Sequence, residues 1–239
     1  VVFAVVSPRL AMTEGGRRIL ERLSASEGRG AGAGEADSAS RRVVEVVDVE
    51  DEELPGLAGT EQPQGVLLVC EEPEWDVERL PDSGRVLVLD AIQDPGNVGT
   101  LIRSAAAFGF DAVIALDGTG DPWGAKAVRA SAGSVFRLPV GRVSCGEALV
   151  ALDSNGWRIL AAAAEGVALR GDGGDGPGRT GRGAGKVALV LGNEGAGVRE
   201  EVRRAASETV AVRMSGQVES LNVGIAGSIL MHELTREDV

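Results

Sequence analysis

Hydrophobic and polar residues form a repeating pattern over residues 84–239. RVLVLD (85–90) centres on a continuous apolar run, as expected for a strand buried on both faces of a parallel sheet. VGTLIRSAAAFG (98–109) follows with apolar residues at helical spacing, and Gly109 is a suitable C-cap for that helix. A strand followed by a helix is therefore the unit that this part of the chain repeats.

The same pattern continues toward the end of the chain. We expect further strands at 112–116, 134–140, 157–164, 186–192 and 209–214. We expect further helices at 123–133, 145–156, 198–206 and 220–234. A glycine-rich stretch at 171–185 is interpreted as a surface insertion rather than a phosphate-binding loop. Alternating strands and helices predict an α/β fold with a mainly parallel sheet.

The first 80 residues differ in character and predict a separate, small α/β domain. Strands are expected at 1–6, 41–49 and 66–70, an amphipathic helix around 14–24, and an acidic helix start at 50–54. Residues 26–40 are small, polar and rich in glycine, which is typical of a flexible loop.

Composition excludes several classes of protein. The chain has 239 residues, 44% of them hydrophobic, so it can bury a sizeable core and is not disordered throughout. No apolar run approaches the ~18 residues that a membrane span requires, so no membrane association is expected. Cys70 and Cys145 are too few for a disulfide scaffold or a zinc site, and we expect both to be buried in the core. No metal is expected.

Charge and the N-terminus bear on partners and location. The formal net charge of −12, taken over the whole chain, argues against a nucleic-acid partner. The chain begins at Val1 without an initiator Met or a basic segment, so no secretory signal is visible in it. We therefore expect a cytoplasmic protein, or an organellar one if a targeting peptide lies upstream of Val1.

The loop after the strand at 85–90 is the first candidate site. In DAIQDPGNVGTLIRSA (90–105), Pro95 and Gly96 favour a turn, and Asn97 is a suitable N-cap for the helix that follows. Arg103 lies six residues beyond Asn97, close to two helical turns away. An ordinary loop, with Arg103 on a solvated helix face, explains this pattern equally well.

The loop LGNEGAGV (191–198) is a second candidate site. Its glycines permit close approach of a ligand to the backbone, but their order does not match the dinucleotide-binding fingerprint, and no phosphate-loop motif is present. The Glu194 carboxylate would also repel a phosphate. The pattern therefore indicates a ligand that carries no phosphate.

MSGQVESLNVGIAGSIL (214–230) is the third candidate. Ser220 is expected to cap the last helix, in which Gly224, Gly227 and Ser228 permit close helix packing, including across a dimer interface. His232, the single histidine, is interpreted as a surface residue of this helix rather than as part of a catalytic triad.

Together, three segments resemble the signature motifs of the SpoU family of RNA ribose methyltransferases, in the SPOUT superfamily. They are QDPGNVGTLIRSAAAFG (93–109), LVLGNEGAGV (189–198) and VRMSGQVESLNVGIAGSIL (212–230), and the resemblance extends over 84–234. Residues 41–70 also resemble the end of a ribosomal-protein-like RNA-binding domain. The resemblance thus implies a partial RNA-binding domain at 1–80, trimmed at its N-terminus, and a methyltransferase domain at 84–239.

The resemblance implies a C-terminal trefoil knot, a homodimer, and methyl transfer from S-adenosylmethionine to a ribose 2′-hydroxyl of rRNA or tRNA, with rRNA favoured by the N-terminal domain. A non-catalytic RNA-binding or assembly protein on the same scaffold is the alternative. A nucleotide-dependent oxidoreductase is disfavoured by the glycine order. The residues matching the family's active site are Asn97, Arg103, Glu194, Ser220 and Asn222. Those matching its S-adenosylmethionine site are Ala162, Ala163, Leu191, Gly192, Gly195, Val212, Met214, Ser220 and Leu221.

The chemistry of this reaction suggests a role for each polar residue. A guanidinium stays protonated at neutral pH, so Arg103 is expected to orient the ribose and its phosphate rather than to act as an ordinary base. Asn97 could hold Arg103, and Glu194 could pair with Arg103 or with a substrate hydroxyl, while Ser220 and Asn222 fix the third loop.

The distribution of charge reconciles RNA binding with an acidic chain. Residues 1–83 carry a net charge of −10, whereas residues 84–239 carry only −2. A nearly neutral domain can bind RNA through a local cluster of cations. The residues expected to form that cluster are Arg103, Arg129 and Arg137.

Overall fold

The computed structural model describes residues 1–27, 44–77, 80–169 and 185–236. The chain divides into two compact units, Val1–Pro73 and Glu74–Val239, which are called the N-terminal and C-terminal units below. The loops expected at 26–40 and 171–185 fall largely outside the described residues. Among the described helices, none is both long and apolar enough to cross a membrane.

The N-terminal unit is a three-stranded sheet with short helices. Its strands are β1 (Phe3–Val6), β2 (Glu45–Asp48) and β3 (Val66–Val69), in the order β2-β1-β3. The central strand β1 pairs in parallel with β2 and antiparallel with β3. The helices are α1 (Glu14–Glu27) and α2 (Leu54–Ala58), and a 3-10 helix spans Pro8–Met12. Its small core contains Ala4, Val6, Leu10, Leu23 and Val44.

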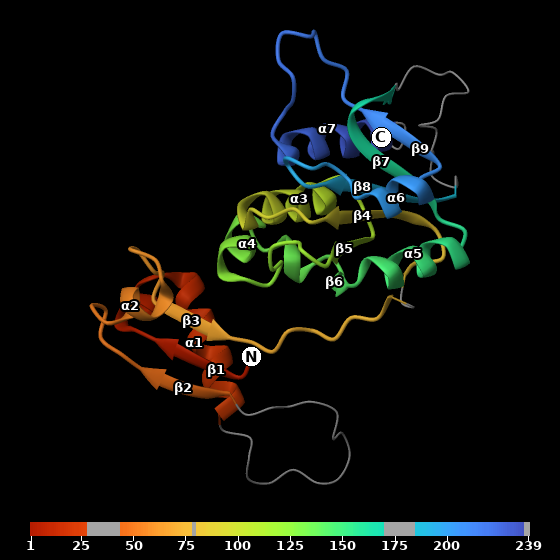
Figure 1. Ribbon diagram of the computed structural model, residues 1–239. Coiled ribbons are helices and arrows are strands. Elements are labelled where there is room, and N and C mark those ends of the chain that lie inside the picture. The colour runs from red at the N-terminus through yellow and green to blue at the C-terminus, as the bar shows by residue number, and fades with distance from the viewer. Residues whose placement is uncertain (28–43, 78–79, 170–184, 237–239) are drawn as a thin grey trace, which may run out of the picture. The chain divides into compact units, whose positions relative to one another are not determined.

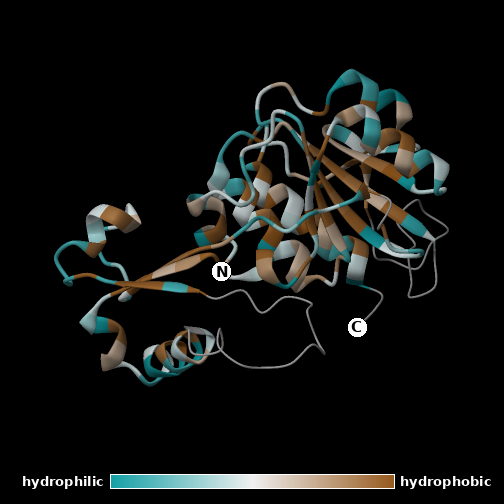
Figure 2. Cartoon of the chain, turned by 90° about the horizontal axis from the view of Figure 1, so that it is seen from below, coloured by the Kyte–Doolittle hydropathy of each residue, from teal (hydrophilic) through white to brown (hydrophobic). Residues whose placement is uncertain are grey.

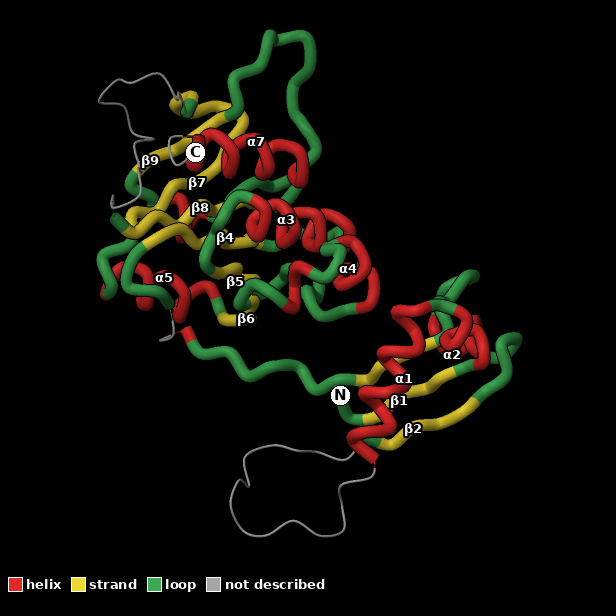
Figure 3. The backbone as a smooth tube through the Cα atoms, turned by 180° about the vertical axis from the view of Figure 1, so that it is seen from behind, coloured by secondary structure: helices red, strands yellow, loops and turns green. Residues whose placement is uncertain are grey.

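The C-terminal unit is built on a six-stranded sheet in the order β6-β5-β4-β8-β7-β9 (Figures 1 and 3). All five strand pairings are parallel, which confirms the predicted α/β class. The strands are β4 (Gly84–Asp90), β5 (Ala112–Leu116), β6 (Val140–Val143), β7 (Arg158–Ala168), β8 (Lys186–Gly192) and β9 (Glu208–Ala211). The helices are α3 (Pro95–Ala107), α4 (Ala125–Ala130), α5 (Cys145–Ser154), α6 (Glu200–Ala205) and α7 (Val223–Thr235).

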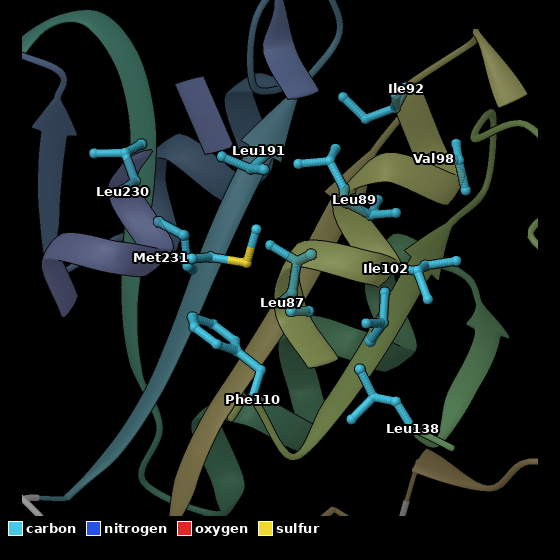
Figure 4. Packing of buried hydrophobic residues seen from close by; sticks show 14 of the residues in the cluster. Leu87, Leu89, Ile92, Val98, Ile102, Phe110, Leu138, Leu191, Leu230 and Met231 are labelled. Carbon is cyan, nitrogen blue, oxygen red and sulfur yellow. The ribbon is translucent and has the colours of Figure 1, made fainter. Parts of the chain in front are cut away.

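Both faces of this sheet are covered, which explains the continuous apolar runs in the sequence. Leu87 and Leu89 of β4 point into a core shared with α3 and α7 (Figure 4). Val86 and Val88 of the same strand point into a second core on the opposite face, shared with α5 and α6. Figure 2 shows the strands of the sheet as hydrophobic along most of their length. Two buried layers therefore hold the carboxyl ends of the strands in fixed positions.

Small residues bring α7 close to its neighbours within one chain. A methyl group on Gly227 would collide with Leu191 and Leu101. The Ser228 hydroxyl lies 2.7 Å from that of Ser104 on α3. The small residues expected to permit close helix packing thus pack α7 against α3 and β8 of the same chain.

Some predicted element boundaries were wrong. The strand expected at 134–140 is a 3-10 helix at Ser134–Phe136, and strand pairing begins only near Pro139, whose carbonyl accepts from Val113 N. Asp94 rather than Asn97 caps α3, because Pro95 takes the first helical position and the Asp94 carboxylate accepts from Gly96 N at 2.9 Å. The helix C-cap is Phe108, and Gly109 follows with a φ of 68°.

Two further expectations concern single residues. Cys145 is buried as predicted, but Cys70 is exposed, since it lies just beyond the end of β3. His232 is exposed on α7 and its ring packs edge-on against Phe108, which confirms the prediction of a surface helix residue.

Candidate active site

Three loops meet at the carboxyl edge of the C-terminal sheet. They follow β4 (91–94), β8 (193–199) and β9 (212–222). Asp90 at the end of β4 pairs with Gly192 at the end of β8, so the first two loops start side by side. Ligands of open parallel sheets bind at this edge, beyond the ends of the strands. The three candidate loops named from the sequence therefore lie at the edge where ligands bind.

Asn97 on α3 connects the three loops. Its side-chain NH₂ donates to Glu194 Oε1 at 3.0 Å, and its Oδ1 accepts from the Asn222 side-chain NH₂ at 3.1 Å. Glu194 lies in the loop after β8, and Asn222 lies at the end of the loop after β9. The structure thus brings together three of the five residues predicted to form the active site.

The orientation of each amide in this chain of hydrogen bonds is determined by α7. Asn222 is the N-cap of α7, and its Oδ1 accepts from the backbone N–H groups of Gly224 at 2.9 Å and Ile225 at 3.3 Å. Its NH₂ group must therefore face Asn97 Oδ1, which turns the NH₂ of Asn97 toward Glu194. The cap expected at Ser220 was wrong, because Asn222 supplies the acceptor for the first free N–H groups of α7.

Asn193 closes the loop after β8 on itself. Its Oδ1 accepts from Gly195 N and Ala196 N, both at 2.9 Å, and its NH₂ donates to Ala91 O at 2.9 Å. Its backbone also exchanges two hydrogen bonds with Gly197. The N–H groups of residues 195–197 are therefore occupied within the loop, and a phosphate would find no free donors there. Asn193 was missed in the sequence analysis, although its place directly before Glu194 in the glycine turn suggested it.

Gly192 is required by the same closure. A Cβ atom at this position would collide with Val198 N and the Gly197 carbonyl group. Backbone therefore passes directly against backbone at the point where β8 ends. Leu191, one residue earlier, is buried in the core shared with α3 and α7.

Apolar residues of β7, β8 and the segment after β9 pack against one another. Ala162 and Val212 are half-buried and pack against the core that contains Leu191. Ala163 and Gly195 are exposed, and Met214 and Leu221 are half-buried. The structure thus groups Ala162, Leu191 and Val212.

Arg103 and Ser220 lie outside the hydrogen-bond network. The Arg103 side chain is exposed on α3 and makes no hydrogen bond or ion pair with any described residue. Asn97 and Glu194 bond to each other, so the expected contacts of Arg103 with Asn97 and Glu194 do not form. Ser220 is exposed and likewise has no hydrogen-bond partner within the described ranges. Arg129 at the end of α4 and Arg137 are exposed.

The ion pair between Asp90 and Arg199 stabilises the loop after β8, and the sequence analysis missed it. Asp90, whose side chain is 1% exposed, accepts from Arg199 N at 2.7 Å and from Arg199 Nε. Arg199 also contacts Asp117 Oδ2 at 3.1 Å and the Asp117 carbonyl at 2.7 Å. These contacts fasten the end of the loop after β8 to the ends of β4 and β5. The sequence did contain a signal for this pair, because Asp90 is an acidic residue at the end of a buried strand.

The lowered pKa values of two carboxylates near the site predict that the stability of the protein depends on pH. The pKa of Asp94 is lowered by hydrogen bonds from Lys126 and Gly96 N, and the pKa of Asp117 by those from Cys145 N and Arg199. A lowered folded-state pKa gives stability that is present above the unfolded value of about 3.9 and is lost as pH falls through the folded-state value. Urea unfolding should therefore show decreasing stability below about pH 4. Asp117→Asn should make that decrease smaller, and an unchanged acid dependence would contradict the assignment.

No group of three His, Cys, Asp or Glu side chains within the described ranges is arranged to hold a metal ion. The side chains available for chemistry at this edge are therefore the hydrogen-bonded Asn97, Glu194 and Asn222, together with the apolar residues Ala162, Leu191 and Val212.

Comparisons with known proteins show which family the chain belongs to. The family described as the SpoU rRNA Methylase family matches residues 84–232, which include all three loops. The 23S rRNA (guanosine(2553)-2'-O)-methyltransferase RlmP of Bacillus subtilis is 36% identical over 186 residues, covering 78% of this chain and 71% of the relative. The 23S rRNA (guanosine-2'-O-)-methyltransferase RlmB of Xanthomonas campestris is 32% identical over 216 residues, covering 84% and 81%.

Solved structures that resemble this chain are also SpoU methyltransferases. The SpoU methyltransferase AviRb from Streptomyces viridochromogenes, crystallised with its cofactor AdoMet, has a TM-score of 0.75 and 26% identity, covering 99% of this chain and 83% of that one. The matched segment contains the sheet, the three loops and the Asn97 network. The chain belongs to the SpoU rRNA Methylase family.

Proposed function

We propose that this protein transfers a methyl group from S-adenosylmethionine to a ribose 2′-hydroxyl of RNA, and that rRNA is its substrate. The observation that carries the proposal is the bridge from Asn97 to Glu194 and Asn222, which assembles polar side chains of three loops at one edge of the sheet. The relatives RlmP and RlmB, which are 23S rRNA methyltransferases, favour rRNA as the substrate. Such a substrate is met in the cytoplasm, or in an organelle that contains ribosomes.

The residues at the sheet edge fit S-adenosylmethionine as the donor. This molecule carries no phosphate, and the loop after β8 offers no free N–H groups at residues 195–197 to bind one. Its binding would rely on apolar and backbone surface at Ala162, Ala163, Leu191, Gly192, Gly195, Val212, Met214, Ser220 and Leu221. When bound, the donor supplies an electrophilic methyl group. The four successive alanines at 161–164 in β7 offer no hydroxyl for a hydrogen bond.

The polar residues would bind and orient the ribose. The exposed guanidinium of Arg103 contacts the phosphate or ribose of the target nucleotide, because its side chain has no partner among the described residues. Glu194 Oε1 is engaged by Asn97, which leaves Oε2 to accept a hydrogen bond from a substrate hydroxyl. The main task of such a site is to hold the ribose hydroxyl close to the methyl group of the donor.

The finer architecture expected from the family is part of the same proposal. The N-terminal unit would be part of an RNA-binding domain, with domain limits near 1–80 and 84–239.

A trefoil knot is supported by the chain path, because α7 follows the edge strand β9 yet packs on α3 and β8. A homodimer is supported by Ile225, which is 54% exposed on α7 beside the network. Sedimentation velocity would test the dimer.

Methyl transfer can be measured directly. The full chain is incubated with labelled S-adenosylmethionine and unmodified total RNA, and the methylated riboses are then mapped. We expect label in rRNA at one or a few riboses. Tight RNA binding without transfer by the wild-type protein would instead support a non-catalytic RNA-binding role on the same scaffold.

Asn97→Asp tests the network itself. The substitution removes the donor to Glu194 and places two carboxylates in contact, so the loop after β8 should move away from α3. We expect kcat to fall about 10- to 100-fold while the KM for RNA changes little, because Asn97 is assigned to positioning rather than to RNA binding. The matched control is Asn155→Asp at the C-terminus of α5, which should keep full activity. Equal activity of both variants would contradict the network's role.

A further inference from the structure

An exposed aromatic pair lies on the C-terminal unit outside the network. The rings of Trp123 and Phe136 lie 6.1 Å apart between centroids at an angle of 54°. Phe136 is 66% exposed, and it is the only phenylalanine or tryptophan among the described residues that is classed as exposed. Trp123 is half-buried and packs on the core behind it. Phe136 is thus an exposed ring that packs on a second, half-buried ring.

The local backbone holds Phe136 in this exposed position. Ala132 and Gly133 both have positive φ, at 49° and 81°, and they turn the chain between α4 and the 3-10 helix at Ser134–Phe136. Val135 is buried in the core, whereas the Phe136 side chain beside it is exposed. The ring is therefore presented by a structured turn.

Two exposed arginines accompany the aromatic pair in the chain. Arg137 follows Phe136 directly, and Arg129 lies on α4, which begins just after Trp123. Neither forms an ion pair or a side-chain hydrogen bond within the described part of the chain. Lys126 and Arg142 are instead paired with Asp94 at 2.7 Å and with Asp121 at 3.5 Å. Arg129 and Arg137 are therefore the cations available to a ligand of the ring.

The surface adjoins the candidate active site. A methyl group on Gly99 of α3 would collide with Ala127 O on α4, so the two helices touch there. Arg103 lies one helical turn beyond Gly99, on the exposed side of α3. A strand of RNA that reaches Arg103 would therefore pass close to α4.

We propose that Trp123 and Phe136 form a base-stacking platform for an unpaired nucleotide of the RNA substrate, next to the nucleotide that is methylated. Arg129 and Arg137 contact the phosphates on either side. An exposed ring with flanking arginines suits single-stranded RNA, whose bases are free to stack on side chains, whereas the bases of a duplex already stack on each other. This inference rests on the proposed function, because it takes RNA to be the substrate.

The test compares full-length variants in RNA binding. The probes are a fluorescein-labelled single-stranded oligouridine and an RNA duplex of the same length, measured by fluorescence anisotropy. Phe136→Ala should bind oligouridine about 5- to 100-fold more weakly, Phe136→Tyr within about twofold of wild type, and the duplex should bind equally to all. Val150→Ala, at an exposed apolar position on α5, is the matched control and should change nothing.

The outcomes separate this platform from the proposed function. With the unmodified RNA substrate, Phe136→Ala should raise the KM for RNA and leave kcat at saturating RNA unchanged. Unchanged oligouridine binding and KM in Phe136→Ala would overturn the platform even if methyl transfer is intact. Loss of a wild-type dimer in Phe136→Ala, seen by sedimentation velocity, would also overturn it, since the ring would then belong to an interface between copies. Conversely, Phe136-dependent binding without any methyl transfer would refute only the proposed function. If Phe136→Ala lowers the melting temperature, the Phe136→Tyr and Phe136→Leu pair decides, because leucine keeps the apolar bulk but lacks the ring.

Discussion

Arg103→Ala should lower the rate of methyl transfer by about 10²–10³-fold while leaving the affinity for S-adenosylmethionine unchanged. The side chain extends from α3 into solvent, and it makes no hydrogen bond or ion pair with any residue that the structure describes. A cation that is not used to hold the fold is available to a substrate. Its removal should therefore affect the RNA-bound state and not the folded state.

Single-turnover methyl transfer and calorimetric titration with the donor would check this prediction. Arg103→Lys should recover part of the rate, because it restores the charge but not the planar donor array. Arg204→Ala, which removes an exposed arginine on α6, is the matched control and should behave as wild type. If Arg103→Ala kept full activity, the assignment of Arg103 to the active site would be wrong.

The sequence predicted the sheet well because burial on both faces leaves a strong signal. β4 appears in the sequence as an uninterrupted apolar run, since Leu87 and Leu89 face one core while Val86 and Val88 face the other. The candidate loops were found for a related reason, as they follow such runs directly. Their grouping at one edge then follows from the parallel arrangement.

Hydrogen-bond partners could not be predicted in the same way. Asn97 and Asp94 are both good N-cap residues, and only the position of Pro95 in the folded helix assigns the cap to Asp94. Asn97 is then free to bond Glu194 and Asn222, which lie far away in the sequence. Its expected contact with Arg103 failed because that pairing was inferred along one helix, whereas the competing partners come from other elements.

Helix packing required the structure for a similar reason. The small residues of α7 are compatible with a dimer interface in the sequence alone. Gly227 lies between Leu191 and Leu101 of its own chain, so its size is explained without a second copy. The size of the side chain that fits at a position depends on its neighbours in the folded structure. A local sequence pattern does not show those neighbours.

Arg199→Met should lower the free energy of unfolding by about 3–5 kcal/mol at neutral pH. Asp90 is almost completely buried, and Arg199 supplies both its ionic partner and one of its hydrogen bonds through Nε. Methionine keeps much of the apolar stem but leaves the carboxylate with only the backbone N–H of residue 199. An unpaired buried charge is far more costly than the exposed pair Arg204–Glu200, so Arg204→Met should cost about 0.5 kcal/mol or less.

A second substitution distinguishes an unpaired charge from lost packing. Asp90→Asn replaces the buried carboxylate by a neutral amide of similar size, so no unpaired charge remains when Arg199 is absent. Adding Asp90→Asn to Arg199→Met should therefore restore much of the stability at about pH 7, as measured by urea unfolding of both single variants and the double variant. A loss that Asp90→Asn does not relieve would mean that Arg199 acts through packing and not through its charge.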